Sequence, residues 1–200
     1  MSKLETNTID TVSGTTTLQI GSTNTNTITL GASGDTITVP TGATFSAPNI
    51  ANKPSFLVKL GPNQTLTDNV TTKIQFGTEI YDTDSVFDST TNYRFTVPTG
   101  SNGKYQVNLV AGLLGSGNTI QDVSLFIYKN GSALVQENYI PSATNPQSGM
   151  TISIAIALDL VATDYLEGYA RINDTSGSPF VDGETGVTST YFNAYKLIGD

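Results

Sequence analysis

The sequence predicts an all-β protein, an antiparallel jelly-roll sandwich head preceded by a short repetitive β stalk. Three observations predict this fold. About nine short apolar runs lie between turns rich in Gly, Pro, Asn and Asp. No stretch carries a convincing helical period. A Thr-, Asn- and Gly-rich segment that repeats roughly every ten residues precedes the apolar runs.

The repeats occupy residues 6–45, where TVSGTTTLQI, GSTNTNTITL and GASGDTITVP each place an apolar pair close to a glycine. Each unit is typical of a short strand and a turn, because Thr favours extended backbone and glycine allows the chain to reverse. One unit buries about two apolar side chains, too little to offset ordering ten residues at roughly 1–2 kcal/mol each. The segment is therefore either a disordered linker or a stalk wound from three chains. We favour the stalk, whose core residues are Leu18, Ile20, Ile28, Leu30, Ile37 and Val39.

A joint between two parts of the chain is expected at residues 47–54, APNIANKP, which carry two prolines and no regular pattern. We therefore expect residues 1–50 to form an attachment segment and stalk. Residues 51–200 form the head in this interpretation.

The head is expected to contain short strands in a regular order. Residues 130–131 supply an Asn-Gly hairpin turn between the fifth and sixth strands. So many strands without helices predict two packed antiparallel sheets. The expected strands are 55–60, 72–76, 93–97, 104–110, 123–128, 133–139, 151–160, 165–172 and 190–198.

The most regular pattern is TISIAIALDL at residues 151–160, which places an apolar side chain at every second position. This period predicts a strand with one face in the core of the head, formed by Ile152, Ile154, Ile156 and Leu158. The intervening side chains are small, so the second face can lie against another sheet or subunit.

Composition excludes several classes of function. Charged residues make up 13% of the chain, the net charge is -8, and there is neither Cys nor His. An acidic chain is not expected to bind nucleic acid, and disulfides, Cys/His zinc sites and histidine catalysis are excluded. The opening MSKLETNTID has no apolar signal core or spanning segment, so no membrane insertion is expected. No cofactor is expected.

Two groups of carboxylates are candidates for chemistry. Asp82, Asp84 and Asp88 could bind Ca²⁺, but they lack the spacing and closing Glu of an EF-hand loop, and a solvated acidic turn is favoured. Asp182 and Glu184 are paired like glycosidase carboxylates but lie in a Gly-rich loop that offers nothing to raise one pKa. No catalytic or metal site is therefore predicted. The aromatic residues are expected in the sheet interior or at a threefold contact: Phe126, Tyr128, Tyr191, Phe192 and Tyr195.

Four passages of the head, in order, resemble the trimeric globular head of the first complement component, which shares its jelly roll with the tumour-necrosis-factor family. The passages are FTVPTGSNGKYQV, VSLFIYKNGS, ISIAIALDLVATDYLEGYA and TYFNAYKLI, and the resemblance spans about residues 54–199. One turn departs from the family, because residues 162–164 read Ala-Thr-Asp where the family often has Gly-Asp. The resemblance implies a homotrimer.

A repetitive stalk ahead of such a head resembles the short fibre proteins of tailed bacteriophages, particularly those of marine cyanobacterial viruses. This resemblance implies a location in the virion, with the N-terminus bound to other virion proteins and the head outward. Three functions remain open: adhesion to a host-surface receptor or glycan, decoration or bridging of virion parts without host contact, and glycan cleavage. Adhesion is the expected function. The small number of repeats counts in favour of the second, because a long host-reaching fibre would have more repeats, and the third is the least favoured.

Overall fold

Short strands separated by tight turns make up the head. The structure, a computed structural model, describes residues 33–43, 52–117, 119–145, 147–175, 177–183 and 189–198. All regular structure in these ranges is β, and the strands are β1 (Ser55–Lys59), β2 (Gln64–Thr65), β3 (Thr72–Lys73), β4 (Thr78–Asp82), β5 (Phe87–Asp88), β6 (Arg94–Thr96), β7 (Gly103–Leu114), β8 (Ile120–Lys129), β9 (Ser132–Tyr139), β10 (Gly149–Leu160), β11 (Tyr165–Asp174), β12 (Phe180–Val181) and β13 (Tyr191–Lys196).

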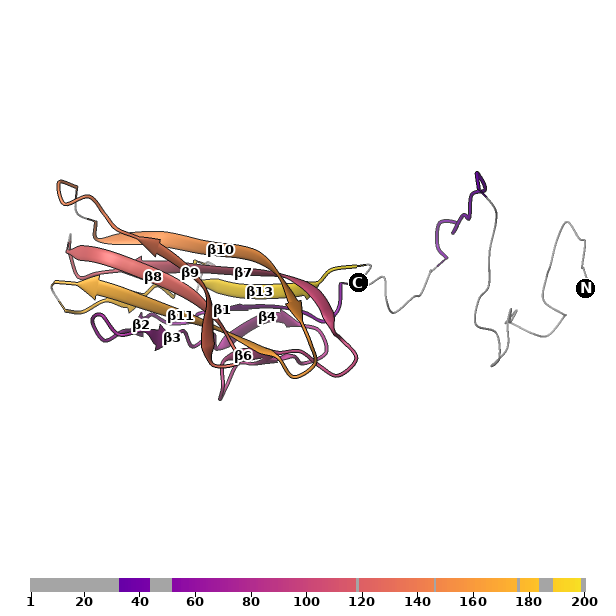
Figure 1. The fold of residues 1–200 in the computed structure, drawn as a ribbon, viewed down its shortest axis with the longest axis horizontal. Coiled ribbons are helices and arrows are strands. Elements are labelled where there is room, and N and C mark those ends of the chain that lie inside the picture. Colours follow the sequence, from indigo (N-terminus) through magenta and orange to yellow (C-terminus); the bar gives the residue numbers. More distant parts are fainter. Residues whose placement is uncertain are drawn as a thin grey trace, which may run out of the picture. The chain divides into compact units, whose positions relative to one another are not determined.

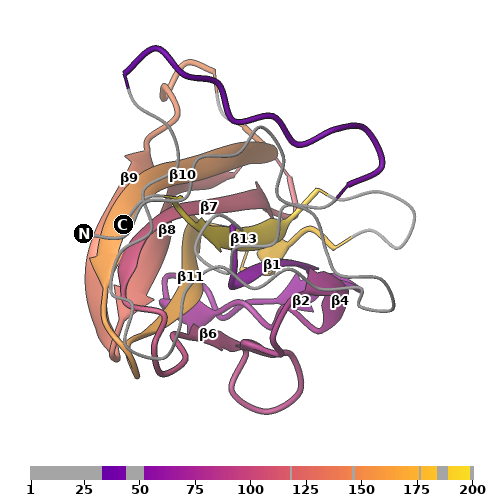
Figure 2. The same ribbon diagram turned by 90° about the vertical axis from the view of Figure 1, so that its right-hand side faces the viewer.

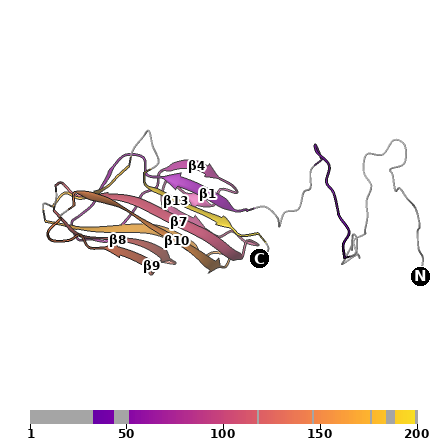
Figure 3. The same cartoon turned by 90° about the horizontal axis from the view of Figure 1, so that it is seen from above.

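These strands form two antiparallel sheets that pack face to face (Figures 1 and 2). The β7 sheet has the order β2-β12-β7-β13-β1-β4, and β10 also pairs with β7. The β8 sheet has the order β5-β6-β11-β8-β9, and β3 also pairs with β11. Figure 3 shows β4, β1, β13, β7 and β10 side by side in the β7 sheet.

The path of the chain identifies the sandwich as a jelly roll. The chain crosses repeatedly between the sheets, and its long strands do so from β7 to β8, from β9 to β10 and from β10 to β11. The first strand, β1, pairs antiparallel with the last, β13. This order confirms the all-β antiparallel jelly-roll fold that the sequence predicts.

Alternating side chains on the two sheets create the core. In β7 the buried residues Tyr105, Val107 and Leu109 point between the sheets, while Gln106 and Asn108 alternate with them. The opposite layer contributes Val123, Leu125 and Ile127 of β8, whose exposed fractions are 0%. Because β7 and β8 bury an apolar residue at every second position, their register is fixed, since a slip of one residue would expose the apolar set.

Phenylalanine side chains fill one part of this core. The ring of Phe56 lies 5.0 Å from those of Phe87 and Phe95, and 5.2 Å from that of Phe192, centroid to centroid. The ring of Tyr105 lies 5.6 Å from that of Phe95, and its hydroxyl donates to the carbonyl of Ser101 at 2.6 Å. Burial raises the pKa of Tyr105 to about 12. The tyrosine therefore closes an apolar cluster with its polar atom satisfied.

Two turns at one end of the sandwich are joined by hydrogen bonds. Asn130 and Gly131 have φ values of 53° and 79°, the conformation of a two-residue hairpin turn between β8 and β9. The Asn130 side chain donates to the carboxylate of Asp164 at 2.7 Å, and Lys129 forms an ion pair with that carboxylate at 2.7 Å. Thr163, the residue before Asp164, also has a positive φ, of 75°. The turn at residues 162–164 is thus joined to the Asn-Gly turn through Asp164.

The N-terminal part of the chain is described only in its residues 33–43. The chain divides into two units, Met1–Ser46 and Ala47–Asp200. Residues 33–43 contain two turns and no strand, and the side chains of Ile37 and Val39 are 63% and 47% exposed. Leu18, Ile20, Ile28 and Leu30 lie outside the described residues, so the stalk core stays a prediction. No helix in the described ranges is long and apolar enough to cross a membrane.

Candidate binding site and uncharged face

One end of the sandwich, here called the tip, contains the loops farthest from the start of β1. β1 begins beside the end of β13, because Ser55 pairs with Tyr195. The start of β8, the start of β10 and the end of β11 lie at the opposite end (Figure 1). Three backbone hydrogen bonds join the loops there: Gly115 N–H to Ser148 O at 2.8 Å, Thr175 N–H to Thr119 O at 3.2 Å, and Ile120 N–H to Gln147 O at 3.3 Å.

A β-bulge places Gln121 at the tip. Asn173 of β11 pairs with Asp122, but the next residue, Asp174, pairs with Ile120. Gln121 is therefore the extra residue of β8, without a partner on β11. Its side chain is exposed, and it has no side-chain hydrogen bond within the described ranges. A β-bulge changes the direction of a side chain that, in a regular strand, would be aligned with a partner on the neighbouring strand.

A pocket of about 400 Å³ opens beside Gln121. Its polar lining comes from Thr119, Gln121, Ser142 and Thr175. Its apolar lining comes from Ile120, Ile140, Pro141 and Ala143. Ile120 and Pro141 are buried and form a fixed apolar surface, whereas the side chain of Ile140 is 69% exposed. None of these eight residues carries a formal charge.

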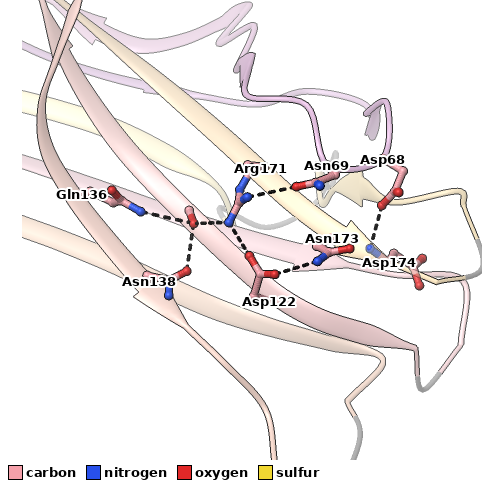
Figure 4. Close-up of polar contacts among 9 residues, drawn as sticks. Asp68, Asn69, Asp122, Gln136, Asn138, Arg171, Asn173 and Asp174 are labelled. Carbon is pink, nitrogen blue, oxygen red and sulfur yellow. Dashed lines mark hydrogen bonds and ion pairs between the residues drawn. The ribbon is translucent and has the colours of Figure 1, made fainter.

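A polar network on the outward face of the β8 sheet holds the strands that lead to this pocket (Figure 4). Arg171 of β11 forms an ion pair with Asp122 of β8, and the Asn173 amide donates to the same carboxylate at 2.8 Å. The second nitrogen of Arg171 donates to the Asn69 side chain at 2.9 Å. The N–H of Asp174 donates to the carboxylate of Asp68 at 2.7 Å. Because these bonds flank the bulge on both strands, they fix the position from which Gln121 and Thr175 extend.

The same network continues across β8 to β9. The Ser124 hydroxyl donates to the Asn138 side chain at 2.9 Å, and Gln136 donates to that hydroxyl at 3.5 Å. Two further ion pairs lie on this sheet, Lys73 with Glu167 at 2.6 Å and Lys129 with Asp164 at 2.7 Å. The outward face of the β8 sheet thus carries charged and amide groups that bind one another, beside the aromatic rings of Phe126, Tyr128 and Tyr169.

The outward face of the β7 sheet has a different character. We call the outward side chains of β10, β7, β13 and β1 the uncharged face. The register aligns Ala155 with Asn108, Asn108 with Asn193, and Asn193 with Leu57 across the four strands. The neighbouring rows bring Tyr191 and Tyr195 of β13 onto the same face. Charged side chains of these strands occupy only its margins: Lys59, Lys104 and Asp159.

Strand β10, which the sequence predicts to have one face in the core, has its other face on the uncharged face. In β10, Ile152 and Ile154 are buried, with exposed fractions of 8% and 6%, and Ile156 and Leu158 are partly buried against the core. The alternate residues, Thr151, Ser153, Ala155, Ala157 and Asp159, are all exposed in the single chain. The strand therefore presents a row of small side chains along the edge of the uncharged face.

The aromatic residues distribute over three locations. Phe192 is fully buried between the sheets. Phe126 and Tyr128 lie on the outward face of the β8 sheet, where the Tyr128 ring stacks on Tyr169 at 4.1 Å between centroids. Tyr191 and Tyr195 alternate with buried residues of β13 and belong to the uncharged face. Alternation in the sequence alone could not say which sheet face was solvated.

The carboxylates of the acidic turn bind the backbone of the turn itself. Asp82 accepts the N–H groups of Val86 and Phe87 at 3.0 and 2.9 Å. Asp88 accepts the N–H of Thr91 at 2.9 Å, and hydrogen bonds from Thr91, from the Asn92 side chain and from the Thr90 N–H hold the pKa of Asp88 far below the ordinary carboxyl range. Asp84 is exposed and has a φ of 70°. Among the described residues, no group of three or more His, Cys, Asp or Glu side chains is arranged to hold a metal ion.

The second carboxylate pair is described only in part. Asp182 is half-buried, and its Cβ lies 3.0 Å from the position that a Cβ on Gly112 would occupy. Its backbone N–H donates to the carbonyl of Gly112 at 2.8 Å. Glu184 lies outside the described residues.

The pocket was not predicted, because it is assembled from three chain segments that are far apart in the sequence. One signal for the bulge exists. Val123, Leu125 and Ile127 are apolar at period two, and Ile120 falls out of phase with them by one residue. Such a slip indicates an extra residue between Ile120 and Val123.

Comparisons with known proteins give similarity in fold. No protein-family model and no curated protein matches the sequence. Among solved structures, the globular domain of zebrafish complement 1qA protein is 16% identical, with a TM-score of 0.49, over 72% of this chain and 98% of that chain. Eiger TNF from S. frugiperda is 15% identical, with a TM-score of 0.49, over 72% of this chain and 91% of that chain. The jelly-roll assignment itself follows from the strand order described above.

Proposed function

We propose that the chain is a structural virion fibre protein, not an enzyme, that assembles as a homotrimer. In this proposal residues 1–50 attach the protein to other virion proteins and form the stalk. Residues 51–200 form heads that project from the particle and adhere to a host-surface receptor or glycan. No nucleic acid, membrane insertion or cofactor is involved.

The composition of the uncharged face is the observation that supports assembly into a trimer. A sheet face exposed to water normally bears charged side chains, as the β8 sheet does with Lys73, Glu167 and Arg171. The uncharged face instead presents tyrosine, amide and small side chains over four strands. Depletion of charge and enrichment of tyrosine are features of the centre of protein interfaces. Two other copies of the chain are the occupants that this face fits, because the apolar pairs of the repeats also need partner chains.

The role in the virion rests on the sequence. The repeats before the head resemble short phage fibres, and the jelly-roll head agrees in fold with that resemblance. The alternative is a decoration or bridging protein with the same trimeric assembly but no host contact. Glycan cleavage, which normally uses a pair of carboxylates, is disfavoured. Asp82 and Asp88 already accept backbone N–H groups of their own turn, and the candidate pair Asp182 and Glu184 belongs to a Gly-rich loop.

A matched pair of substitutions tests the assembly. Ala155→Glu places a charge at an exposed position on the uncharged face, and Ala133→Glu places the same charge at an exposed position on β9 of the other sheet. Light scattering of the wild-type chain and of Ala133→Glu should give three times the 21.1 kDa of one chain. Ala155→Glu should reduce the mass to that of a monomer without changing the circular dichroism of the fold. A wild-type monomer, or a trimer that tolerates Ala155→Glu, would contradict the assembly.

Binding to cells tests the adhesion. Labelled wild-type trimer should bind a panel of cyanobacterial cells, and cells that bind it should release no reducing sugar. A trimer that binds no cell of the panel but binds purified virion parts would favour the decoration function. Release of reducing sugar would support the enzyme instead.

A further inference from the structure

We propose that the tip pocket is a saccharide-binding site for an uncharged glycan of the host surface. This inference deepens the proposed function and rests on it for the source of the ligand. The binding site itself is inferred from the lining, the bulge and the position of the pocket.

The lining has the two kinds of surface that a sugar ring needs. The Ser142 hydroxyl bonds to Thr144 at 2.9 Å and the Thr175 hydroxyl donates to the Thr119 carbonyl at 3.4 Å. A hydroxyl has one donor and two acceptor positions, so the Thr175 hydroxyl can still accept from a ligand, and the Gln121 amide offers a carbonyl and an NH₂ group. Sugar hydroxyls also donate and accept, so they match groups that can do either. Buried Ile120 and Pro141 supply the apolar surface against which the C–H face of a ring can pack.

The charge of the site selects neutral sugars. None of the lining residues carries a charge, and the whole chain has a net charge of -8. An anionic glycan would lose hydration without gaining a cationic partner in the pocket. Arg171, the cation nearest along β11, is already held by Asp122 and Asn69. The site is therefore expected to discriminate against uronic-acid and phosphate-bearing polymers.

Gln121 has a fixed backbone position and a side-chain amide that can bind a ligand. As the extra residue of the bulge it has no strand partner, and its amide makes no hydrogen bond within the described ranges. The Asp122–Arg171–Asn173 network beside it holds the backbone in place (Figure 4). Because the backbone is fixed, only the Gln121 side chain loses conformational entropy when a ligand binds, and its amide has no protein hydrogen bond to break. The pocket volume of about 400 Å³ lies within the range of small-molecule sites, about 300–1,000 Å³.

The position of the pocket fits a glycan on a surface that the head meets. Ser55, the first residue of β1, lies at the opposite end of the sandwich from the loops that line the pocket. The tip therefore points away from the residues that connect the head to the N-terminal part of the chain.

Oligosaccharide binding tests the site directly. The probes are neutral tetra- to hexasaccharides of glucose, mannose and galactose, with an oligogalacturonate of equal length as the anionic counterpart. Isothermal calorimetry and saturation-transfer NMR on the full chain should show binding of at least one neutral probe and none of the anionic one. Gln121→Ala should weaken this binding about tenfold or more, because two hydrogen-bonding groups are lost. Ala143→Trp, at an exposed lining position, should block the pocket while leaving the core untouched.

Gln75→Ala is the matched control, because it truncates the same kind of side chain at an exposed position between β3 and β4, outside the pocket lining and outside the polar network. Its affinity for the neutral probe should equal that of the wild-type chain. Absence of any neutral binding, equal binding of the anionic probe, or unchanged affinity in both pocket variants would overturn the inference.

Cell adhesion separates this inference from the proposed function. Periodate, which cleaves vicinal diols, should abolish adhesion of the trimer to cells, whereas protease treatment of the cells should not. Adhesion that survives Gln121→Ala and Ala143→Trp, or that protease rather than periodate removes, overturns the pocket as the adhesion site and leaves the fibre function standing. Binding of neutral sugar without adhesion to any cell supports the pocket and overturns the host-adhesion function.

Discussion

Asp164 shows how a single carboxylate can join two turns. Burial by itself raises the pKa of Asp164, but the Lys129 ion pair, the Val161 N–H and the Asn130 amide outweigh burial and hold that pKa below its ordinary value. The folded state therefore binds fewer protons at this group than the unfolded state does in the acidic range. The stability that Asp164 contributes is present at neutral pH and is lost as the pH falls through the ordinary carboxyl range and then through the lower folded-state pKa.

Asp164→Asn should lower the free energy of unfolding at neutral pH by about 1–3 kcal/mol, because a buried acceptor of three hydrogen bonds becomes partly a donor. The variant should also lose less stability than the wild-type chain between pH 7 and pH 3. Urea unfolding at the two pH values measures both effects. Asp159→Asn, at an exposed position on β10, should change neither quantity appreciably. Equal acid sensitivity of wild type and Asp164→Asn would contradict the role of this carboxylate.

The acidic turn leads to a second prediction about individual residues. Because Asp82 and Asp88 already bind backbone N–H groups and Asp84 is exposed, Ca²⁺ is not expected to stabilise the turn. A chelator should leave both the melting temperature and the oligomeric mass unchanged, and Asp84→Asn should be tolerated. Asp88→Ala should destabilise the head by about 0.5–2 kcal/mol, because it removes a cap of several N–H groups. Loss of the trimer in chelator would instead indicate a structural metal site.

At the scale of elements, β10 offers a test of which face is buried. Ile154 is 6% exposed and faces the core, whereas Ser153 is exposed on the other side of the strand. Ile154→Ala should lower the free energy of unfolding by roughly 2–5 kcal/mol, because it removes buried methyl groups and leaves a cavity. Ser153→Ala should have little effect on the same thermal or urea measurement. Unchanged stability of Ile154→Ala would show that the face had been assigned wrongly.

The long strands could be predicted from the sequence because their alternation is complete. Every strand of six residues or more lies at an expected position: β7, β8, β9, β10, β11 and β13. The expected strand 104–110 continues to Leu114, because Ala111 and Leu113 are also buried. The expected strand 72–76 pairs only through Thr72–Lys73, although Ile74 and Phe76 are buried.

Four strands were not predicted: β2, β4, β5 and β12. Three of them have two residues, too few to show a period. In β4 the extra residue of a bulge, Ile80, is 50% exposed, so its apolar residues do not alternate with burial. Nor could the pocket or the Arg171–Asp122 ion pair be predicted, because both depend on which distant segments the fold brings together. Side-chain type locates a buried face, whereas the location of a surface site depends on the topology.

At the scale of the molecule, the outward faces of the two sheets differ in charge. Polar groups on the β8 sheet bind one another through ion pairs and through hydrogen bonds of side-chain amides. Strands β8 and β11 of this sheet extend to the pocket at the tip. The centre of the uncharged face instead presents small, tyrosine and amide side chains, with a hydrogen bond from Gln106 to Asn108 at 3.3 Å, and the proposed function assigns this face to partner chains. In the proposed function, assembly and recognition use different surfaces, so substitutions should separate the two.

The last prediction concerns the dependence of the stalk on the head. If Leu18, Ile20, Ile28 and Leu30 pack about a threefold axis, they are buried only when three chains are present, so stalk order depends on the head holding the chains together. Residues 1–50 alone should be disordered and monomeric, while residues 51–200 should still trimerise. Changing Ile28 and Leu30 to Ser in the full chain should increase amide exchange in residues 6–45 and impair mounting on the virion. The mass of the trimer and its adhesion should stay unchanged.

Light scattering and amide exchange on the two fragments and the double variant provide the measurement. An ordered monomeric fragment 1–50, or a fragment 51–200 that stays monomeric at high concentration, would return the N-terminal segment to the interpretation as a polar linker.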